Sequence, residues 1–288
     1  MDIIIGNEQI FRLQPKLTME RVLEKAWDKK TSVFGGLKNI FNRPRSEEIQ
    51  ITYSEFRYEP FWHVACNVHY DYDRTSSYNI KIPDPEVKRV TIDGKDYPVT
   101  TDPRQFTIKG IEHCIEEASK NVIIDAVRGQ DKKEWGEYLS DDKEIVSDLS
   151  QLSTDENIVV MPEMRASAVV RQVLTSLLWP IQADKIYEEK ADVNIVDLYF
   201  RPVYAFEYKW EPNNSKKGSQ TAVVEFDGLT GAMTSGGVTL RQQVDNLMTR
   251  DLLFDVSAEA ANLLIPGGGI AVRVTKYMVD SHIGTEKK

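Results

Sequence analysis

Alternating apolar and polar residues predict a long strand after Pro60. Trp62, Val64, Cys66, Val68, Tyr70 and Tyr72 fall on one side, and His63, Ala65, Asn67, His69, Asp71 and Asp73 on the other. This period of two is typical of an antiparallel strand with one buried and one solvated face. Residues 203–210 alternate in the same way after Pro202. Because proline cannot donate to a ladder, Pro60 and Pro202 are expected at a strand boundary, a bulge or an edge.

Helical spacing of three and four residues appears in several other segments. Met19, Val22, Leu23, Ala26 and Trp27 predict a helix near the start of the chain. A second helix is predicted after Pro162, ending at Trp179-Pro180. A third is predicted from Ile108, Ile111, Ile115, Ala118, Val122 and Ala126, with Gly129 as its end. Shorter helices are expected at 135–139, 145–152, 240–248 and 258–264, before a last strand over 270–275.

The segments around Pro60 and Pro202 resemble each other at an offset of 142 residues. The offset aligns Trp62 with Tyr204 and Val64 with Phe206. Each segment follows a predicted helix, and each precedes a hairpin signal, Ile92-Asp93-Gly94-Lys95 or Phe226-Asp227-Gly228. We interpret this as an internal duplication, and two similar strands without common origin remain the alternative.

These patterns together predict an α+β fold of two repeated halves, each a helix packed on an antiparallel sheet, with a helical connector. The expected divisions are a first helix-plus-sheet half at 1–105, an acidic helical connector at 106–160, and a second half with C-terminal helices at 161–288.

The segment from Arg201 to Phe206, followed by residues 222–231, resembles a PepSY-type repeat. The likeness rests on the turn Asp227-x-x-Thr230-Gly231. More broadly, the segment resembles cystatin-like helix-on-sheet modules. The resemblance implies a helix on a small antiparallel sheet and a non-catalytic role. Such domains usually lie outside the cytoplasm behind a signal or anchor, which this sequence does not display.

Composition and charge narrow the class of protein. The chain has 288 residues, 41% hydrophobic and 28% charged, which is too apolar for disorder. Its apolar runs are far shorter than the roughly 18–20 residues that span a bilayer. The two cysteines, Cys66 and Cys114, favour a reducing, cytoplasmic compartment. A net charge of −9 argues against nucleic-acid binding.

The charge is uneven, and one basic stretch stands out. Residues 12–45 hold nine basic and three acidic side chains, whereas residues 112–156 hold five basic and thirteen acidic ones. A basic amphipathic segment can dock on a protein partner or lie on an anionic membrane as a peripheral contact, and the simpler interpretation is a helix packed on its own sheet. The candidate contact residues are Lys29, Lys30, Phe34, Leu37, Lys38, Phe41, Arg43 and Arg45.

No metal, cofactor or catalytic motif emerges. His63 and His69 are about 20 Å apart on a straight strand, too far to share a metal. His69 and Asp71 could share one only with a third ligand from elsewhere. Cys66 and Cys114 are expected to be buried and inert, and Gly267–Gly269 precedes a strand-like segment, so it is expected to be a hinge and not a phosphate loop.

The sequence therefore favours a non-enzymatic binding or adaptor protein, a component of a larger assembly with a protein partner. Self-association through unpaired sheet edges is a further expectation. The alternatives are a peripheral membrane protein using residues 29–45, and an enzyme whose site combines distant residues such as His69, Asp71 and a carboxylate of the second half.

Overall fold

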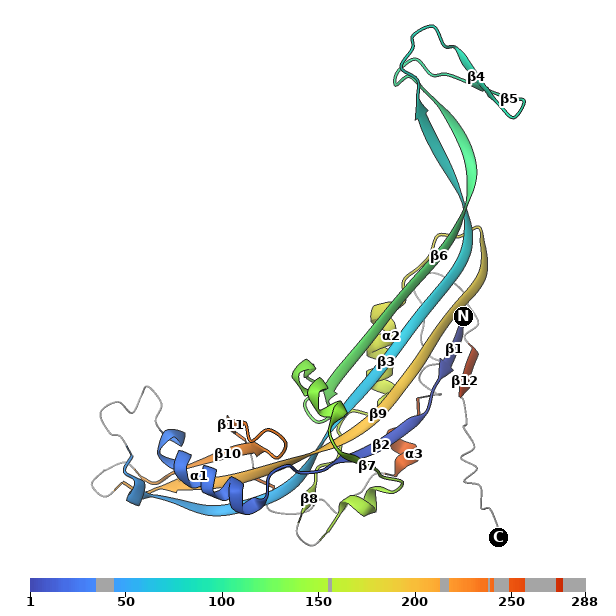
Figure 1. Ribbon diagram of the computed structural model, residues 1–288. Coiled ribbons are helices and arrows are strands. Elements are labelled where there is room, and N and C mark those ends of the chain that lie inside the picture. Colours follow the sequence, from blue (N-terminus) through green and yellow to red (C-terminus); the bar gives the residue numbers. More distant parts are fainter. Residues whose placement is uncertain are drawn as a thin grey trace, which may run out of the picture.

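The computed structural model describes residues 1–34, 44–154, 157–212, 218–237, 239–240, 249–256 and 273–276. Within these ranges ten strands form one mixed sheet, and a separate two-stranded hairpin, β4–β5, lies beyond it. The sheet is long, narrow and curved, with α1 near one end and β4–β5 at the other (Figure 1). The helices and strands are β1 Asp2–Ile5, β2 Glu8–Leu13, α1 Met19–Val33, β3 Ile49–Lys81, β4 Arg89–Ile92, β5 Lys95–Pro98, β6 Gln105–Asp125, β7 Lys143–Ile145, β8 Ile158–Val159, α2 Ala166–Leu177, β9 Lys185–Trp210, β10 Gln220–Asp227, β11 Met233–Ser235, α3 Arg250–Leu253 and β12 Arg273–Lys276.

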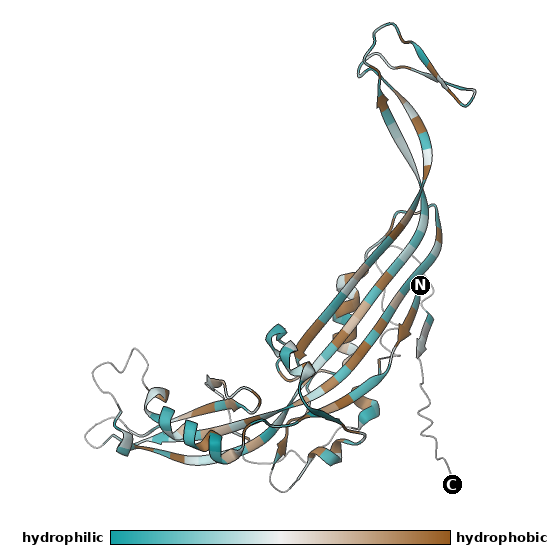
Figure 2. Cartoon of the chain, viewed as in Figure 1, coloured by the Kyte–Doolittle hydropathy of each residue, from teal (hydrophilic) through white to brown (hydrophobic). Residues whose placement is uncertain are grey.

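Three long antiparallel strands carry the sheet. β3 is central, with β9 on one side and β6 on the other. Its 33 residues give a contour length of about 110 Å at roughly 3.3 Å per residue. Along the free side of β9 lie β1, β2 and β10 in turn. The predicted apolar face of β3, from Trp62 to Tyr72, is buried. Bands of apolar and polar residues alternate along these strands in Figure 2.

The predicted fold of two repeated helix-on-sheet halves is wrong, because one sheet runs through both. α1, from the first half, packs on β9 and β10 of the second half as well as on β3, and Val22 and Ala26 share a core with Tyr204, Phe206 and Phe226. α2, from the second half, packs on first-half strands. Val169 and Val173 share a core there with Trp62, Val64 and Val68. Each helix therefore covers strands of both halves, and among the described residues the core is shared between the two halves.

The prediction of a helical connector at 106–160 is also wrong for its longest helix. Residues 105–125 form β6, which pairs with β3 throughout. Ile111 and Ile115 supplied the helical spacing, yet both side chains are exposed on the strand. The half-buried residues are even-numbered, including Ile108, Cys114 and Ala118. The short helix expected at 135–139 is confirmed as a 3-10 helix, Lys133–Ser140. The one expected at 145–152 is confirmed only at Leu149–Leu152, because Ile145 ends β7.

Pro60 and Pro202 lie inside continuous strands and not at their ends. Pro60 O accepts from Ala126 N (3.1 Å), and Pro202 O accepts from Gly228 N (2.9 Å). Each acceptor faces the point where the neighbouring strand, β6 or β10, has just ended. Because the nitrogen of a strand residue faces the same side as its carbonyl, the missing N–H interrupts no ladder.

Other predictions are confirmed in part. α1 and α2 form where expected, and Asp93 and Gly94 turn the β4–β5 hairpin with positive φ values of 46° and 77°. β12 pairs parallel with β1, close to the strand predicted at 270–275. The helices predicted at 240–248 and 258–264 and the glycine hinge at 267–269 fall almost entirely outside the described residues. Among the described residues, none of the helices has the length and apolarity needed to cross a bilayer.

Candidate functional site

Six buried charged side chains form a network on the sheet face opposite the two helices. Glu55, Arg57 and Glu59 alternate along β3 with the core residues Phe56 and Tyr58, so they share the other face of that strand. The neighbouring strands supply the remaining three, which are Arg201 of β9 and Glu225 and Asp227 of β10. All six are at most 8% exposed, which sets them apart from ordinary surface charges.

Arg57 is the centre of this network. Its Nη1 donates to Glu55 Oε1 (2.8 Å), its Nε to Glu59 Oε1 (2.8 Å) and its Nη2 to Glu225 Oε1 (2.5 Å). Burial acts to lower the pKa of Arg57, but the carboxylates of Glu59 and Glu225 outweigh it and the pKa is raised. Arg57 therefore stays charged and holds three carboxylates from two strands.

Arg201 extends the network toward the 3-10 helix Lys133–Ser140. It donates to Asp227 Oδ2 (2.9 Å) and Glu59 Oε2 (2.5 Å). Its guanidinium carbon lies 4.3 Å from the centre of the Trp135 ring, a cation–π contact. The Tyr138 hydroxyl donates to the same Asp227 oxygen (2.9 Å). Burial, together with Asp227, raises the pKa of Tyr138 well above its usual value, so the phenol is a neutral hydrogen-bond donor.

A cavity of about 500 Å³ opens beside this network. Arg201, Glu225 and Asp227 of the network line it, and so do the cationic Arg128 and Lys132. The six buried side chains comprise two arginines and four carboxylates, so acidic groups are in excess. Arginine, tyrosine and backbone donors already occupy these carboxylates. The cavity thus presents hydrogen-bond acceptors in fixed positions beside cationic side chains. This arrangement suits stabilisation of the fold or binding of a polar group, and not proton transfer.

Two matching turns end β6 and β10 at this cavity. Asp227 Oδ1 accepts from the N–H groups of Leu229 and Thr230, and Asp125 Oδ1 accepts from those of Val127 and Arg128, all at 2.9 Å. A glycine with φ near +70° closes each turn, Gly231 at 71° and Gly129 at 69°. The Asp-x-x-Thr-Gly turn of the second half therefore has a counterpart in the first, with arginine in place of threonine.

The basic segment predicted as a contact surface is only partly described. Phe34 is buried against Trp210, with ring centroids 5.8 Å apart. Lys30 is also buried, with Nζ 3.6 Å from the centre of the Trp27 ring. These two residues therefore belong to the packing of α1 and not to a free face. Lys29 and Arg45 are exposed, and Leu37, Lys38, Phe41 and Arg43 lie outside the described residues.

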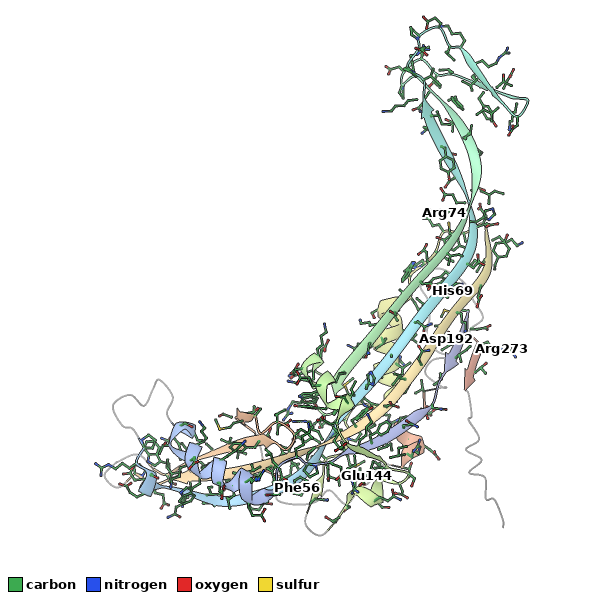
Figure 3. All side chains as sticks on the ribbon, in the orientation of Figure 1. Phe56, His69, Arg74, Glu144, Asp192 and Arg273 are labelled. Carbon is green, nitrogen blue, oxygen red and sulfur yellow. The ribbon has the colours of Figure 1, made fainter. Side chains whose placement is uncertain are left out.

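The histidines and cysteines singled out in the sequence are not gathered into a site. His69 Nδ1 lies 3.2 Å from Glu117 Oε1, its partner across the β3–β6 ladder (Figure 3). Asp71 lies between Ile115 and Glu188 in the sheet register. Burial raises the pKa of the Cys66 thiol to about 12, so that thiol is inert. Within the described ranges, no group of three or more His, Cys, Asp or Glu side chains could hold a metal ion.

A second feature is an arm that extends past the end of β9. Beyond Asp73, which pairs with Lys185 at the start of β9, eight further residue pairs join Arg74–Lys81 of β3 to Gln105–Glu112 of β6. We call these two segments the arm, and residues 82–104 beyond them the tip. Figure 3 places Arg74 at the base of the arm, away from the helices. The arm side chains Tyr78 and Ile80 are exposed.

Sequence reasoning missed the charged network, although a signal was present. Glu55, Arg57 and Glu59 alternate on one strand face, and the 142-residue offset aligns Glu59 with the oppositely charged Arg201. Such alternation is usually a solvated face. No family model, curated protein or solved structure matches this chain, so the resemblance to PepSY-type and cystatin-like modules stays a prediction.

Proposed function

We propose that this protein is a cytoplasmic, non-enzymatic binding or adaptor protein, a component of a larger assembly that contacts a protein partner through the tip of its arm. The observation that carries the proposal is a structured tip held away from the body of the sheet (Figure 1). A two-stranded ribbon is marginally stable by itself and adds little to a core. Its presence is therefore better explained by contact with another molecule than by the needs of the fold.

The tip has a defined structure. Arg104 Nη2 donates to the carbonyl oxygens of Asp84 (2.5 Å) and Val87 (3.0 Å). The ring of Tyr97 lies 5.9 Å from that of Phe106, which is buried. These contacts fix the β4–β5 hairpin against the end of the arm. A pre-organised tip loses little conformational entropy on binding, which favours a role in recognition.

The cysteine chemistry is consistent with the proposed compartment. Cys66 and Cys114 are both free thiols, as expected where disulfides are not maintained.

The charged network fits the same proposal, because it stabilises the sheet from which the arm projects and has none of its carboxylates free for catalysis.

Removal of the tip tests the proposal. Lys81 pairs with Gln105, so an Asn-Gly turn in place of residues 82–104 closes the hairpin with the chain still in register. Wild type and variant are tagged and recovered from cells, and bound proteins are quantified by mass spectrometry. We expect a stoichiometric protein partner with the wild type, its loss with the variant, and unchanged thermal unfolding of the body. A partner retained by the variant, or a wild-type chain recovered alone, contradicts the proposal.

A further inference from the structure

Among the residues that the structure describes, none pairs with the outer edge of β6 along residues 107–119. β6 pairs with β3 without a register shift, and among the described residues no other strand pairs with it there. Ile123 O accepts from Lys132 N, and Asp125 N donates to Gln130 O, so these odd-numbered residues point away from β3. Backbone direction alternates along a regular strand, so the odd-numbered residues 107–119 also present their N–H and C=O groups to the free edge.

Such an edge is unusual in a protein that remains alone. Natural edge strands are commonly protected by proline, a bulge, short length or charged side chains, and of these devices residues 107–119 have only charges, among them Lys109 and Glu117, which are of opposite sign. The same odd-numbered residues carry exposed apolar side chains. Ile111 is 64% exposed and Ile115 is 69% exposed, on the face opposite α2.

The sequence of this edge is symmetric in its chemistry. His113 stands at the centre, Ile111 and Ile115 follow on either side, and Lys109 and Glu117 come next. In an antiparallel pair of identical strands centred on His113, each isoleucine faces an isoleucine and each lysine faces a glutamate. Cross-strand apolar pairs and opposite-charge pairs both stabilise a sheet.

We propose that a second copy of this chain pairs antiparallel with β6 through this edge, with the two-fold axis at His113. Ile111 then lies opposite Ile115 of the second copy, and Lys109 opposite Glu117. Centring the axis on Glu112 would place Ile111 opposite His113 and Lys109 opposite Ile115. Centring it on Cys114 would place Ile111 opposite Glu117. Of these registers, the one at His113 matches apolar with apolar side chains and opposite charges with each other.

This dimer goes beyond the proposed function and does not depend on it. The paired edge covers residues 107–119, whereas the tip comprises residues 82–104, so the tip-deletion variant keeps the whole edge. A dimer that forms without the tip separates the two proposals, since either can fail while the other stands.

A register-specific disulfide tests the geometry. In the full-length chain carrying Cys114→Ser, His113→Cys places two thiols across the axis, at a Cα separation of about 5.5 Å, within the range that disulfides span. We expect a covalent dimer under mild oxidation. The matched control Ser119→Cys, also in Cys114→Ser, gives none, because the two residues at position 119 would be about 40 Å apart.

Charge reversal tests the pairing without covalent capture. Lys109→Glu or Glu117→Lys alone places like charges opposite each other, twice per dimer. We expect each to raise the dimer dissociation constant roughly tenfold in sedimentation velocity. The double variant restores opposite charges, and its dissociation constant is expected to return to near the wild-type value. A chain that stays monomeric at all concentrations, cross-linking at position 119 but not 113, or failure of the double variant to recover would each overturn the proposal.

Discussion

Glu59 and Arg201 face each other across the β3–β9 ladder and form an ion pair, although 142 residues separate them in the chain. The same offset aligns the Pro60 and Pro202 segments, so these two similar segments pair with each other around a local two-fold axis at this ion pair. The two-fold symmetry extends to the hydrogen bonds that β3 and β9 donate to the segments preceding α2 and α1, respectively. Trp62 Nε1 donates to Met164 O (2.8 Å), and Tyr204 Oη donates to Leu17 O (2.6 Å).

Loss of Arg57 should strongly destabilise the fold. Arg57→Met leaves the buried carboxylates of Glu55, Glu59 and Glu225 without their shared cation, which costs about 3–5 kcal/mol in comparable buried pairs. Urea unfolding measures the change. The exposed ion pair of Arg89 with Asp96 supplies the control, because Arg89→Met should cost about 1 kcal/mol or less. Equal losses in the two variants would contradict a structural role for the network.

The two turn glycines should be equally intolerant of a side chain. Gly129→Ala and Gly231→Ala each force a residue with Cβ into positive φ, at a cost of about 1–3 kcal/mol. The added Cβ would also lie 2.9 Å from Met164 Sδ or Leu17 Cδ1, respectively. Gly218→Ala is the control, since a Cβ there meets nothing within 4 Å. Thermal unfolding compares the three variants, and a Gly129→Ala protein as stable as Gly218→Ala would disprove the equivalence of the turns.

The arm should loosen in acid. Hydrogen bonds from Tyr78 (2.6 Å) and Arg74 (2.5 Å) lower the pKa of Glu112 to about 2. Because this pKa lies below the ordinary value of 4.5, the contacts favour the folded arm at higher pH, and the benefit is lost as pH falls from about 4.5 to about 2. Tyr78→Phe should raise the pKa of Glu112 in an NMR titration.

Tyr97→Phe, at the tip, is the matched control for this titration and should leave Glu112 unchanged. A Glu112 that titrates near its ordinary value in the wild type would show that the arm contacts do not persist in solution.

Asp197 should make the protein less stable as pH rises. Burial raises its pKa to about 6, against the opposing effects of the Gln9 N–H and Lys143. Because the folded-state pKa exceeds the ordinary 3.8, ionisation between about 4 and 6 costs stability, and the cost levels off above 6. Asp197→Asn removes the charge, so its unfolding free energy should rise relative to wild type over this interval. Parallel pH profiles for the two proteins would contradict this.

The sequence predicted those elements whose partners are close in the chain or whose burial is one-sided. The alternation from Trp62 to Tyr72 predicted a buried strand face, and Asp93-Gly94 predicted a tight hairpin. α1 was predicted as well, although Leu23 and Trp27 from its apolar pattern are exposed while Lys30 is buried.

The predictions that were wrong concern features whose contacts come from residues distant in the chain. β6 looked helical because Ile111 and Ile115, on its exposed face, completed a helical spacing with residues on the other face. The charged network was invisible because Arg57 obtains one of its carboxylates from Glu225, 168 residues away. The packing of each helix on strands of the other half is also non-local, since neither helix shows by its own sequence which strands it will cover.

The continuity of β3 has a mechanical consequence. A single strand passes from the core beneath α1, through the charged network, to the tip without interruption. A pull on the tip along the arm would run nearly parallel to the part of β3 next to the arm, so it would load the β3–β9 ladder there in shear, with several hydrogen bonds sharing the force. The ladder would therefore resist such a pull far better than a force that opened it from one end.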